Sequence, residues 1–311
     1  MTAPLSLTFI PESIGNPYFE AVTEGLKSGC NALDCDFTSV GPAIMEAQSQ
    51  VPFVNEQIQH GTSIIAIAPN SPTALNELFD KARRGGALVL TVSSDIPGHE
   101  THRDAAILPL DFSQVGAAQV ELMGSLIDYQ GQVAILSTTA QATDQAEWIA
   151  DMRRILSSNV KYSRMKLVVA AYGADDPGKS KAQTEKILDK FPNVRGIIAP
   201  TVVGLAAAAQ VLQASGKARQ VKLTGLGMPR QMRHFVANGM VTAFQLWNPY
   251  LLGVLAAHFS VGVKRGTIRN VPGKTFQVPG FEKLLVRERS VVYVQSRLTT
   301  FDRSNIDRFN F

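Results

Sequence analysis

Short runs of apolar and β-branched residues alternate with amphipathic stretches through the first third of the chain. The runs predict strands at 5–10, 35–41, 63–69, 87–94 and 104–111. The stretches after the first three runs predict helices at 17–32, 47–61 and 71–86. In the second helix, Val51, Val54 and Ile58 share one face, and Gly61 follows as a stop signal. Ser71 stands just before a proline and is expected to cap the third helix.

The same alternation begins again in the second half of the chain. Strands are predicted at 131–138, 166–173, 194–200, 220–227 and 241–247. Helices are predicted at 143–158, 176–191, 202–216, 229–239 and 248–266. Alternation of this kind is typical of parallel sheets with right-handed crossovers, so two runs predict an α/β protein with two doubly wound lobes. Ligands of such sheets bind beyond the carboxyl ends of the strands, which makes the residues after each strand the candidates.

Length and composition agree with two lobes. The chain has 311 residues, 45% of them hydrophobic and 18% charged, which suits two cores better than one small one. No apolar run approaches the roughly 18 residues that cross a bilayer. The opening MTAPLSLTFIP has neither a basic region nor a cleavage-site pattern. We therefore expect either a cytosolic protein or a chain whose leader has been removed.

Charge and cysteine content exclude two further classes of partner. The net charge is +4, from 30 Lys and Arg against 26 Asp and Glu, and the basic residues are scattered apart from short clusters. That pattern predicts a solvated surface and no nucleic-acid site. Cys30 and Cys35 are the only cysteines and lack a histidine that would complete a metal set. Two buried thiols and one disulfide both remain open.

The residues at the predicted strand ends share one kind of chemistry. The first run supplies Glu12, Asn16, Tyr18, Phe19, Pro69, Asn70, Ser93, Ser94 and Asp95. The second run supplies Asp144, Gln145, Pro200, Thr201, Trp247 and Asn248. Carboxylates, amides and hydroxyls beside large aromatic rings suit a neutral polyol, which offers hydroxyls at its edge and C–H groups on its face. Residues 9–19 contain only one glycine, Gly15, so a phosphate cradle is disfavoured there.

Each of these residues also has a purely structural interpretation. Ser93, Asp95, Asp144 and Asn248 are all suited to capping a helix. Phe19 and Trp247 are candidates for the core, and Glu12 and Gln145 for a solvated surface. The polyol hypothesis therefore depends on the agreement of several strand ends and not on any single residue.

Signals for catalysis are weak. The chain has no G-x-S-x-G, no H-E-x-x-H and no G-x-x-x-x-G-K-[ST], and none of its five histidines follows a strand beside a nucleophile. Glu12 and Asp144 are the one candidate pair of carboxylates for a sugar-processing enzyme, but no spacing in the sequence brings them together. We expect a binding protein without enzymatic activity and without a cofactor or metal.

Several longer segments carry a family resemblance. They are TDQAEWIADM, IIAPTVVGLAAAAQ, TGLGMPRQMRHFVANGMVTAFQLWN, the tail FDRSNIDRFNF and the aromatic opening NPYF. With them the chain resembles, over nearly its full length, the type I periplasmic solute-binding proteins of ABC sugar transporters. It is most similar to the branch of the autoinducer-2-binding and rhamnose-binding proteins.

The resemblance implies two lobes joined by a three-segment hinge, at 109–112, 244–248 and 291–296. The N-terminal lobe would comprise 1–110 and 248–290, and the C-terminal lobe 111–247 and 291–311. A monosaccharide would bind in the cleft, the hinge would close on it, and an ABC permease would receive it. The protein would then be a periplasmic monomer that neither spans the membrane nor binds nucleic acid.

The resemblance also assigns ligand-binding residues. Autoinducer-2 binders have a lysine where this chain has Glu12, and an acidic residue where it has Ser93; Asp95 keeps the second acid of that run. A small residue of the family is replaced by Val202. The expected ligand-binding set is Glu12, Tyr18, Phe19, Ser93, Asp95, Asp144, Gln145, Pro200, Val202, Trp247 and Asn248.

The change from lysine to Glu12 replaces a donor by an acceptor, which favours a deoxyhexose, hexose or sugar alcohol over autoinducer-2. Two alternatives remain open: an autoinducer-2-type signal binder, and a sugar-sensing partner of a membrane receptor. A LacI-type repressor would require a DNA-binding headpiece, and the first strand begins too near the start of this chain to leave room for one.

Overall fold

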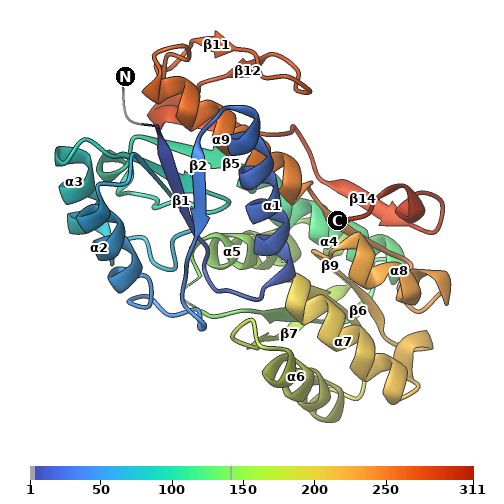
Figure 1. Ribbon diagram of the computed structural model, residues 1–311. Helices are drawn as coiled ribbons and strands as arrows, with labels where there is room; N and C mark the ends of the chain where they lie inside the picture. Colours follow the sequence, from blue (N-terminus) through green and yellow to red (C-terminus); the bar gives the residue numbers. More distant parts are fainter. Residues whose placement is uncertain (1–3, 141) are drawn as a thin grey trace. The chain divides into compact units, whose positions relative to one another are not determined.

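The computed structural model describes residues 4–140 and 142–311 and divides the chain into two compact units. Unit 1 comprises Met1–Leu110 and Asn248–Ser296, and unit 2 comprises Asp111–Trp247 and Arg297–Phe311. Both are α/β units with a parallel sheet, as the alternation of strands and helices predicts (Figure 1). Within the described residues, no helix combines the length and the apolar character that a bilayer span requires.

Unit 1 is built on a six-stranded sheet in which every neighbouring pair is parallel. The order of its strands is β13-β5-β4-β3-β1-β2. Their bounds are β1 Ser6–Ile10, β2 Asp36–Ser39, β3 Ile64–Ile67, β4 Leu88–Val92, β5 Ala105–Leu108 and β13 Val291–Tyr293. The four helices described in this unit are α1 Pro17–Ala32, α2 Val51–His60, α3 Asn76–Arg84 and α9 Pro249–Lys264.

The helices of unit 1 cover both faces of its sheet (Figure 1). On one face, Val54 of α2 and Phe79 of α3 pack with Ile65 in a fully buried cluster. On the other face, α1 and α9 cross closely, because glycines occupy the contact. A Cβ atom on Gly25 would lie 2.0 Å from the carbonyl oxygen of Tyr250, so only glycine permits this helix separation.

Unit 2 has a four-stranded parallel sheet in the order β7-β6-β8-β9. Its strands are β6 Gly131–Ser137, β7 Met165–Tyr172, β8 Val194–Ala199 and β9 Lys222–Gly225. A single bridge between Leu226 and Gln245 continues the sheet into β10, Ala243–Leu246, which pairs antiparallel with β14, Thr299–Asp302. The helices are α4 Val115–Leu126, α5 Thr143–Ser158, α6 Pro177–Lys190, α7 Val202–Ala214 and α8 Pro229–Ala237.

Short elements complete both units. β11 (Thr275–Phe276) and β12 (Leu284–Leu285) form a small antiparallel pair in unit 1. The short 3-10 helices are η1 Glu100–His102, η2 Phe112–Gln114, η3 Val160–Tyr162, η4 Lys217–Arg219, η5 Glu288–Ser290 and η6 Ile306–Arg308.

The structure corrects several boundaries predicted from the sequence. Helix α4 was not predicted, and neither were the four short strands β11 to β14. Helix α3 begins at Asn76, because Ser71 caps a separate turn by accepting from the N–H groups of Thr73 and Ala74. Helix α2 begins at Val51 and not at residue 47. The segment 291–296 belongs to unit 1, where β13 pairs with β5, although the sequence placed it in the C-terminal lobe.

Cys30 and Cys35 are free, buried thiols. The backbone N–H of Cys35 donates to the carbonyl oxygen of Cys30 at 3.1 Å, which turns the chain at the end of α1. A hydrogen bond between the two thiols raises the pKa of Cys30 far above its ordinary value, and burial adds to the increase. The same hydrogen bond lowers the pKa of Cys35. Of the two alternatives that the sequence left open, the structure contains the thiol pair.

Candidate ligand site

In unit 1 the loop after β1 places two aromatic rings at the start of α1. Asn16 caps this helix by accepting from the N–H of Tyr18 at 2.9 Å, and a proline occupies its first turn. The rings of Tyr18 and Phe19 meet edge to face at 5.0 Å, and both are buried. The Phe19 ring also lies 6.4 Å from that of Phe9, so it packs in the core while Tyr18 turns its hydroxyl toward β4.

Two side-chain contacts join the loop after β1 to the loop after β4. The hydroxyl of Tyr18 lies 2.8 Å from that of Ser93, and the Ser94 hydroxyl donates to Oε1 of Glu12 at 3.3 Å. Ser93 has φ +74°, a left-handed conformation that a non-glycine residue rarely adopts and that concentrates at functional sites. Since β3 lies between β1 and β4 in the sheet, these contacts span the end of β3 and gather the predicted residues of unit 1.

Asp95 is held by a buried cation that sequence reasoning missed. Nε and Nη2 of Arg103 each donate to one Asp95 carboxylate oxygen at 2.6 Å. The hydroxyl of Thr91 donates to Oδ1 of Asp95 at 2.8 Å. The Arg103 side chain is 1% exposed and that of Asp95 15%, so this is a bidentate ion pair largely removed from water. The sequence contains no periodic signal that would have identified Arg103.

A second buried side chain, Gln50, fixes the loop that carries Glu12. Its Nε2 donates to the carbonyl oxygens of Pro11 at 3.0 Å and Ala68 at 2.7 Å, and its Oε1 accepts from the N–H of Asn70 at 2.9 Å. Nδ2 of Asn70 then donates to the carbonyl oxygen of Glu12 at 2.9 Å. The loops after β1 and β3 are therefore joined through two amide side chains, of which only Asn70 was a sequence candidate.

In unit 2 the predicted Asp–Gln pair begins helix α5. Oε1 of Gln145 accepts from the hydroxyl of Ser137 and from the N–H of Thr138, the latter at 3.1 Å. Oδ1 of Asp144 accepts from the N–H of Gln145 at 2.7 Å. Burial raises the pKa of the Asp144 carboxyl to about 6, and the negative charge of Asp175 contributes to that increase.

Asp175 connects the end of β7 with the end of β8. The hydroxyl of Thr201 donates to Oδ1 of Asp175 at 2.6 Å and also accepts from the N–H of Gly204 as the cap of α7. Pro200 and Val202, on either side of this cap, are buried. Three neighbouring strand ends of unit 2 thus bring Asp144 and Asp175 close enough for their charges to interact. Asp175 was not among the predicted ligand-binding residues.

Trp247 and Asn248 mark the last predicted strand end. The Trp247 ring lies 6.1 Å from that of Trp148 and 6.2 Å from that of Phe112, and it is only 4% exposed. Trp247 therefore belongs largely to an aromatic cluster of unit 2. Asn248, in unit 1, caps helix α9 by accepting from the N–H of Leu251 at 3.2 Å. This is the structural interpretation that the sequence had allowed for Asn248.

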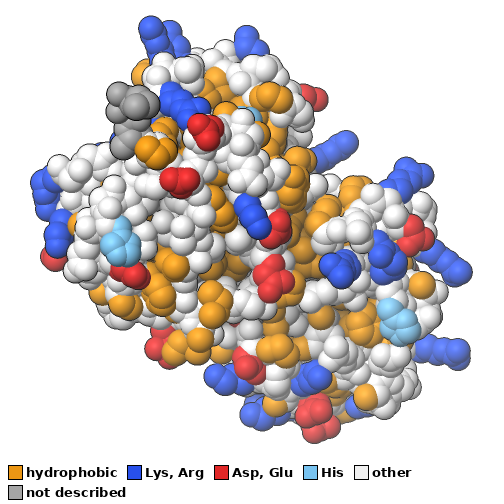
Figure 2. Space-filling model, in the orientation of Figure 1, with side chains coloured by type: hydrophobic (Ala, Val, Ile, Leu, Met, Phe, Trp, Pro, Cys, Tyr) orange, Lys and Arg blue, Asp and Glu red, His pale blue; other side chains and the backbone are white. Residues whose placement is uncertain are grey.

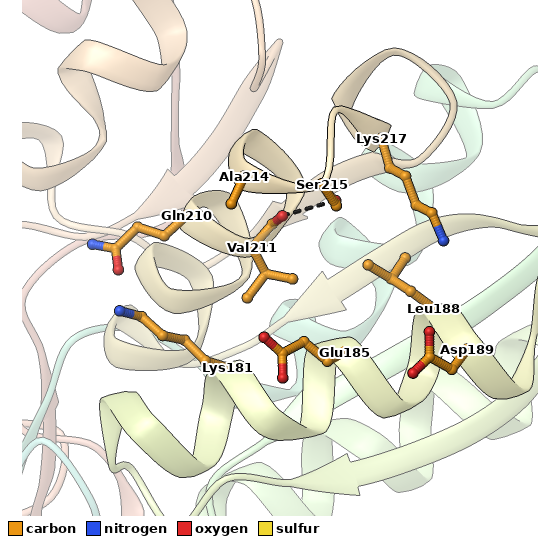
Figure 3. A pocket seen from close by; sticks show the side chains of 9 residues that line it. All are labelled: Lys181, Glu185, Leu188, Asp189, Gln210, Val211, Ala214, Ser215 and Lys217. Atoms are coloured by element: carbon orange, nitrogen blue, oxygen red, sulfur yellow. Dashed lines mark hydrogen bonds between the residues drawn. The ribbon is translucent and has the colours of Figure 1, made fainter.

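One hollow of the structure lies beside these strand ends, and another lies away from them. A hollow of about 390 Å³ in unit 1 is lined by the loop after β1 and by α1, including Phe19 and Glu20. A groove of about 540 Å³ in unit 2 lies between α6, from Lys181 to Asp189, and the C-terminal half of α7, with Glu185 and Lys217 along it (Figure 3). Each of these helices begins after a strand end, so the groove is at the far end from Asp144 and Thr201.

On the face shown in Figure 2, Lys and Arg are scattered among Asp and Glu, as a solvated surface requires.

A family model described as a periplasmic binding protein domain matches residues 7–267 of the chain. The chain belongs to this family. The resemblance and the fold that the sequence predicted are thereby confirmed. The family consists of solute-binding proteins, and its members that serve ABC importers act outside the cytoplasm.

Two solved structures match along nearly the whole of both chains. A sugar ABC transporter protein from Actinomyces odontolyticus is 35% identical, with a TM-score of 0.80 over 99% of this chain and 98% of that one. An ABC transporter solute-binding protein from Clostridium phytofermentas, with bound L-rhamnose, is 31% identical, with a TM-score of 0.92 over 99% of each chain. The D-ribose/D-allose-binding protein of Pseudomonas aeruginosa is 21% identical over 243 residues, which cover 76% of this chain and 75% of that protein.

Proposed function

We propose that this protein binds one neutral monosaccharide, of the deoxyhexose or related class, and delivers it to the permease of an ABC importer. The observation that carries the proposal is the gathering of acceptor groups at the strand ends of each unit, with Glu12 and Asp95 in unit 1 and Asp144 in unit 2. The 31% identical relative with bound L-rhamnose supports a deoxyhexose. The protein would act in the periplasm as a monomer, and no bond would be made or broken.

The chemistry of these groups fits hydroxyls. Carboxylate oxygens accept only, so each can take protons from sugar hydroxyls in short, charge-assisted hydrogen bonds. The hydroxyl pair of Tyr18 and Ser93 can both donate and accept, which suits the ring oxygen and the remaining hydroxyls of a sugar. Because Asp95 is paired with Arg103, the strand ends of unit 1 do not present an uncompensated cluster of negative charge.

Isothermal titration calorimetry tests the proposal directly. The panel comprises L-rhamnose, L-fucose, D-ribose, D-allose, D-arabinose, D-glucose, galactitol and autoinducer-2. We expect one of the neutral sugars to bind with a Kd on the order of 1 μM, which corresponds to about −8 kcal/mol. Recovery of the unchanged sugar after incubation would show that no reaction occurs. Tight binding of autoinducer-2 alone would favour the signal binder, and the absence of heat with every sugar would contradict the proposal.

Replacing Glu12 with glutamine should weaken binding of that sugar without unfolding the protein. The variant keeps the size of the side chain but removes the charge, and with it about 1.5–3 kcal/mol of a charge-assisted hydrogen bond, or roughly a 10- to 150-fold increase in Kd. Calorimetry with the Glu12→Gln and Glu56→Gln variants checks this, because Glu56 is exposed on helix α2 and serves as the matched control. Equal affinity of Glu12→Gln and wild type would place Glu12 outside the ligand site.

A further inference from the structure

The ion pair between Arg103 and Asp95 constrains how Asp95 meets a ligand. Oδ1 of Asp95 accepts from both Nε of Arg103 and the hydroxyl of Thr91, and Oδ2 accepts from Nη2 of Arg103. A carboxylate oxygen has two lone pairs, so within the described part of the molecule Oδ1 is saturated and Oδ2 keeps one acceptor direction. The side chain retains 15% exposure, which leaves room for a single hydroxyl to approach.

A contact beyond the two with Asp95 fixes the Arg103 side chain. Its Nη1 donates to the carbonyl oxygen of Arg289 at 2.7 Å, and Arg289 has φ +56°. The Nη1 group of Arg289 pairs with Glu100 at 2.7 Å, which holds that segment just before β13. All of the contacts that Arg103 makes here are therefore to groups that the sheet or a neighbouring turn holds in place, and its planar fork has a single orientation.

We infer that Arg103 is a positioning residue for sugar binding: it aims the remaining acceptor direction of Asp95 at one hydroxyl and neutralises the carboxylate, so that at this position of the ligand a hydroxyl is preferred over the ammonium group of an amino sugar. The inference rests on the proposed function. An unpaired Asp95 would attract a cationic amine as readily as a hydroxyl, whereas the ion pair leaves a dipolar acceptor without a net charge. A lysine would supply the charge but not the bidentate geometry.

Three variants separate the effect of the Arg103 charge from the effect of its bidentate geometry. Arg103→Lys keeps the charge and loses the fork, and Arg103→Gln loses both. Arg154→Gln, which removes a surface ion pair with Asp151 in unit 2, is the matched control. The probes are the neutral sugar with the lowest Kd in the calorimetric panel and its amino-deoxy analogue at pH 6.5, where the amine is a cation. Circular dichroism confirms folding before each titration.

We expect Arg103→Lys to weaken neutral-sugar binding by about tenfold while keeping the preference over the amino sugar, because only the geometry is lost. Arg103→Gln should weaken neutral-sugar binding and also reduce that preference by about tenfold, since Asp95 becomes an unpaired anion. Arg154→Gln should leave both quantities within about twofold of wild type.

The inference is overturned if Arg103→Gln keeps the wild-type preference for the neutral sugar over the amino sugar, whether or not its affinity for the neutral sugar falls. A purely structural role of Arg103 would leave that preference unchanged. Should Arg103→Gln not fold, the double variant Asp95→Asn with Arg103→Gln removes both charges together and avoids a buried unpaired anion. This double variant should bind the neutral sugar about tenfold more weakly and still discriminate against the amine; wild-type affinity would overturn the inference. If the wild-type protein binds no sugar at all, it is the proposed function that fails.

Discussion

Replacing Asp144 with asparagine is expected to stabilise the sugar-free protein at pH 7.5 and at the same time to weaken sugar binding by tenfold or more. Burial and the nearby charge of Asp175 raise the pKa of Asp144 from 3.8 to about 6, so the ionised carboxylate is unfavourable in the folded protein. Each pKa unit corresponds to 1.36 kcal/mol, and the half-buried side chain is partly screened, so the gain should be ~1–3 kcal/mol. The same substitution removes an acceptor proposed for a sugar hydroxyl.

The effect of Asp144 on the free energy of unfolding depends on pH in a definite direction. Because the pKa is higher in the folded state than in the unfolded one, the destabilisation by Asp144 is complete above about pH 6 and disappears as the pH falls below 3.8. Asparagine does not titrate, so the advantage of the variant should be present at pH 7.5 and nearly absent at pH 4.

Urea unfolding of wild type and Asp144→Asn at both pH values measures the two free energies. Asp151→Asn is the matched control, since Asp151 lies on the same helix and pairs at the surface with Arg154. We expect this control to shift the free energy of unfolding by less than about 1 kcal/mol at pH 7.5. An Asp144→Asn variant that is no more stable than wild type at pH 7.5, or equally stabilised at pH 4, would contradict the prediction.

Replacing Gln50 with leucine should lower the free energy of unfolding by ~3–5 kcal/mol. The side chain is fully buried, and its removal leaves the carbonyl oxygens of Pro11 and Ala68 and the N–H of Asn70 without their partner. A buried polar group that loses its hydrogen bond costs about 1–3 kcal/mol, and leucine recovers only the apolar contacts. Because Gln50 holds the loop that carries Glu12, sugar affinity should fall as well.

Urea unfolding and calorimetry of the Gln50→Leu variant check both effects. Gln48→Leu is the matched control, because Gln48 is exposed two residues away and its substitution should change stability by less than about 0.5 kcal/mol. A free energy of unfolding of Gln50→Leu within 1 kcal/mol of the wild-type value would contradict the prediction. It would mean that water or backbone movement satisfies the freed groups. Asp144→Asn and Gln50→Leu therefore weaken binding with opposite effects on stability, which distinguishes a ligand group from a supporting one.

Local pattern was enough for most of the helices and strands. Val51, Val54 and Ile58 recur at helical spacing, and Gly61 ends that helix in the left-handed conformation that glycine favours. Helix α4 was not predicted from the sequence because its apolar and small residues are spread around its axis, which leaves little amphipathic contrast. Its Gly116 instead permits close packing, since a Cβ there would lie 3.0 Å from the carbonyl oxygen of Trp148. β13 is only three residues long and gains its place from pairing with β5.

The sequence by itself determined the α/β alternation and the strand-end positions at which Glu12, Ser93, Asp95 and Asp144 stand. It also determined the resemblance that the family match confirms. The alternation and the strand-end positions follow from local spacing, because side chains two or four residues apart share a face of a strand or helix. Only the tertiary structure decided which of these side chains meet, since Tyr18 and Ser93 are 75 residues apart and come together through the order β4-β3-β1. The supporting residues Gln50, Arg103 and Asp175 depend on the same long-range order: their contacts exist only where separate strand ends are brought side by side, and no local period in the sequence records that.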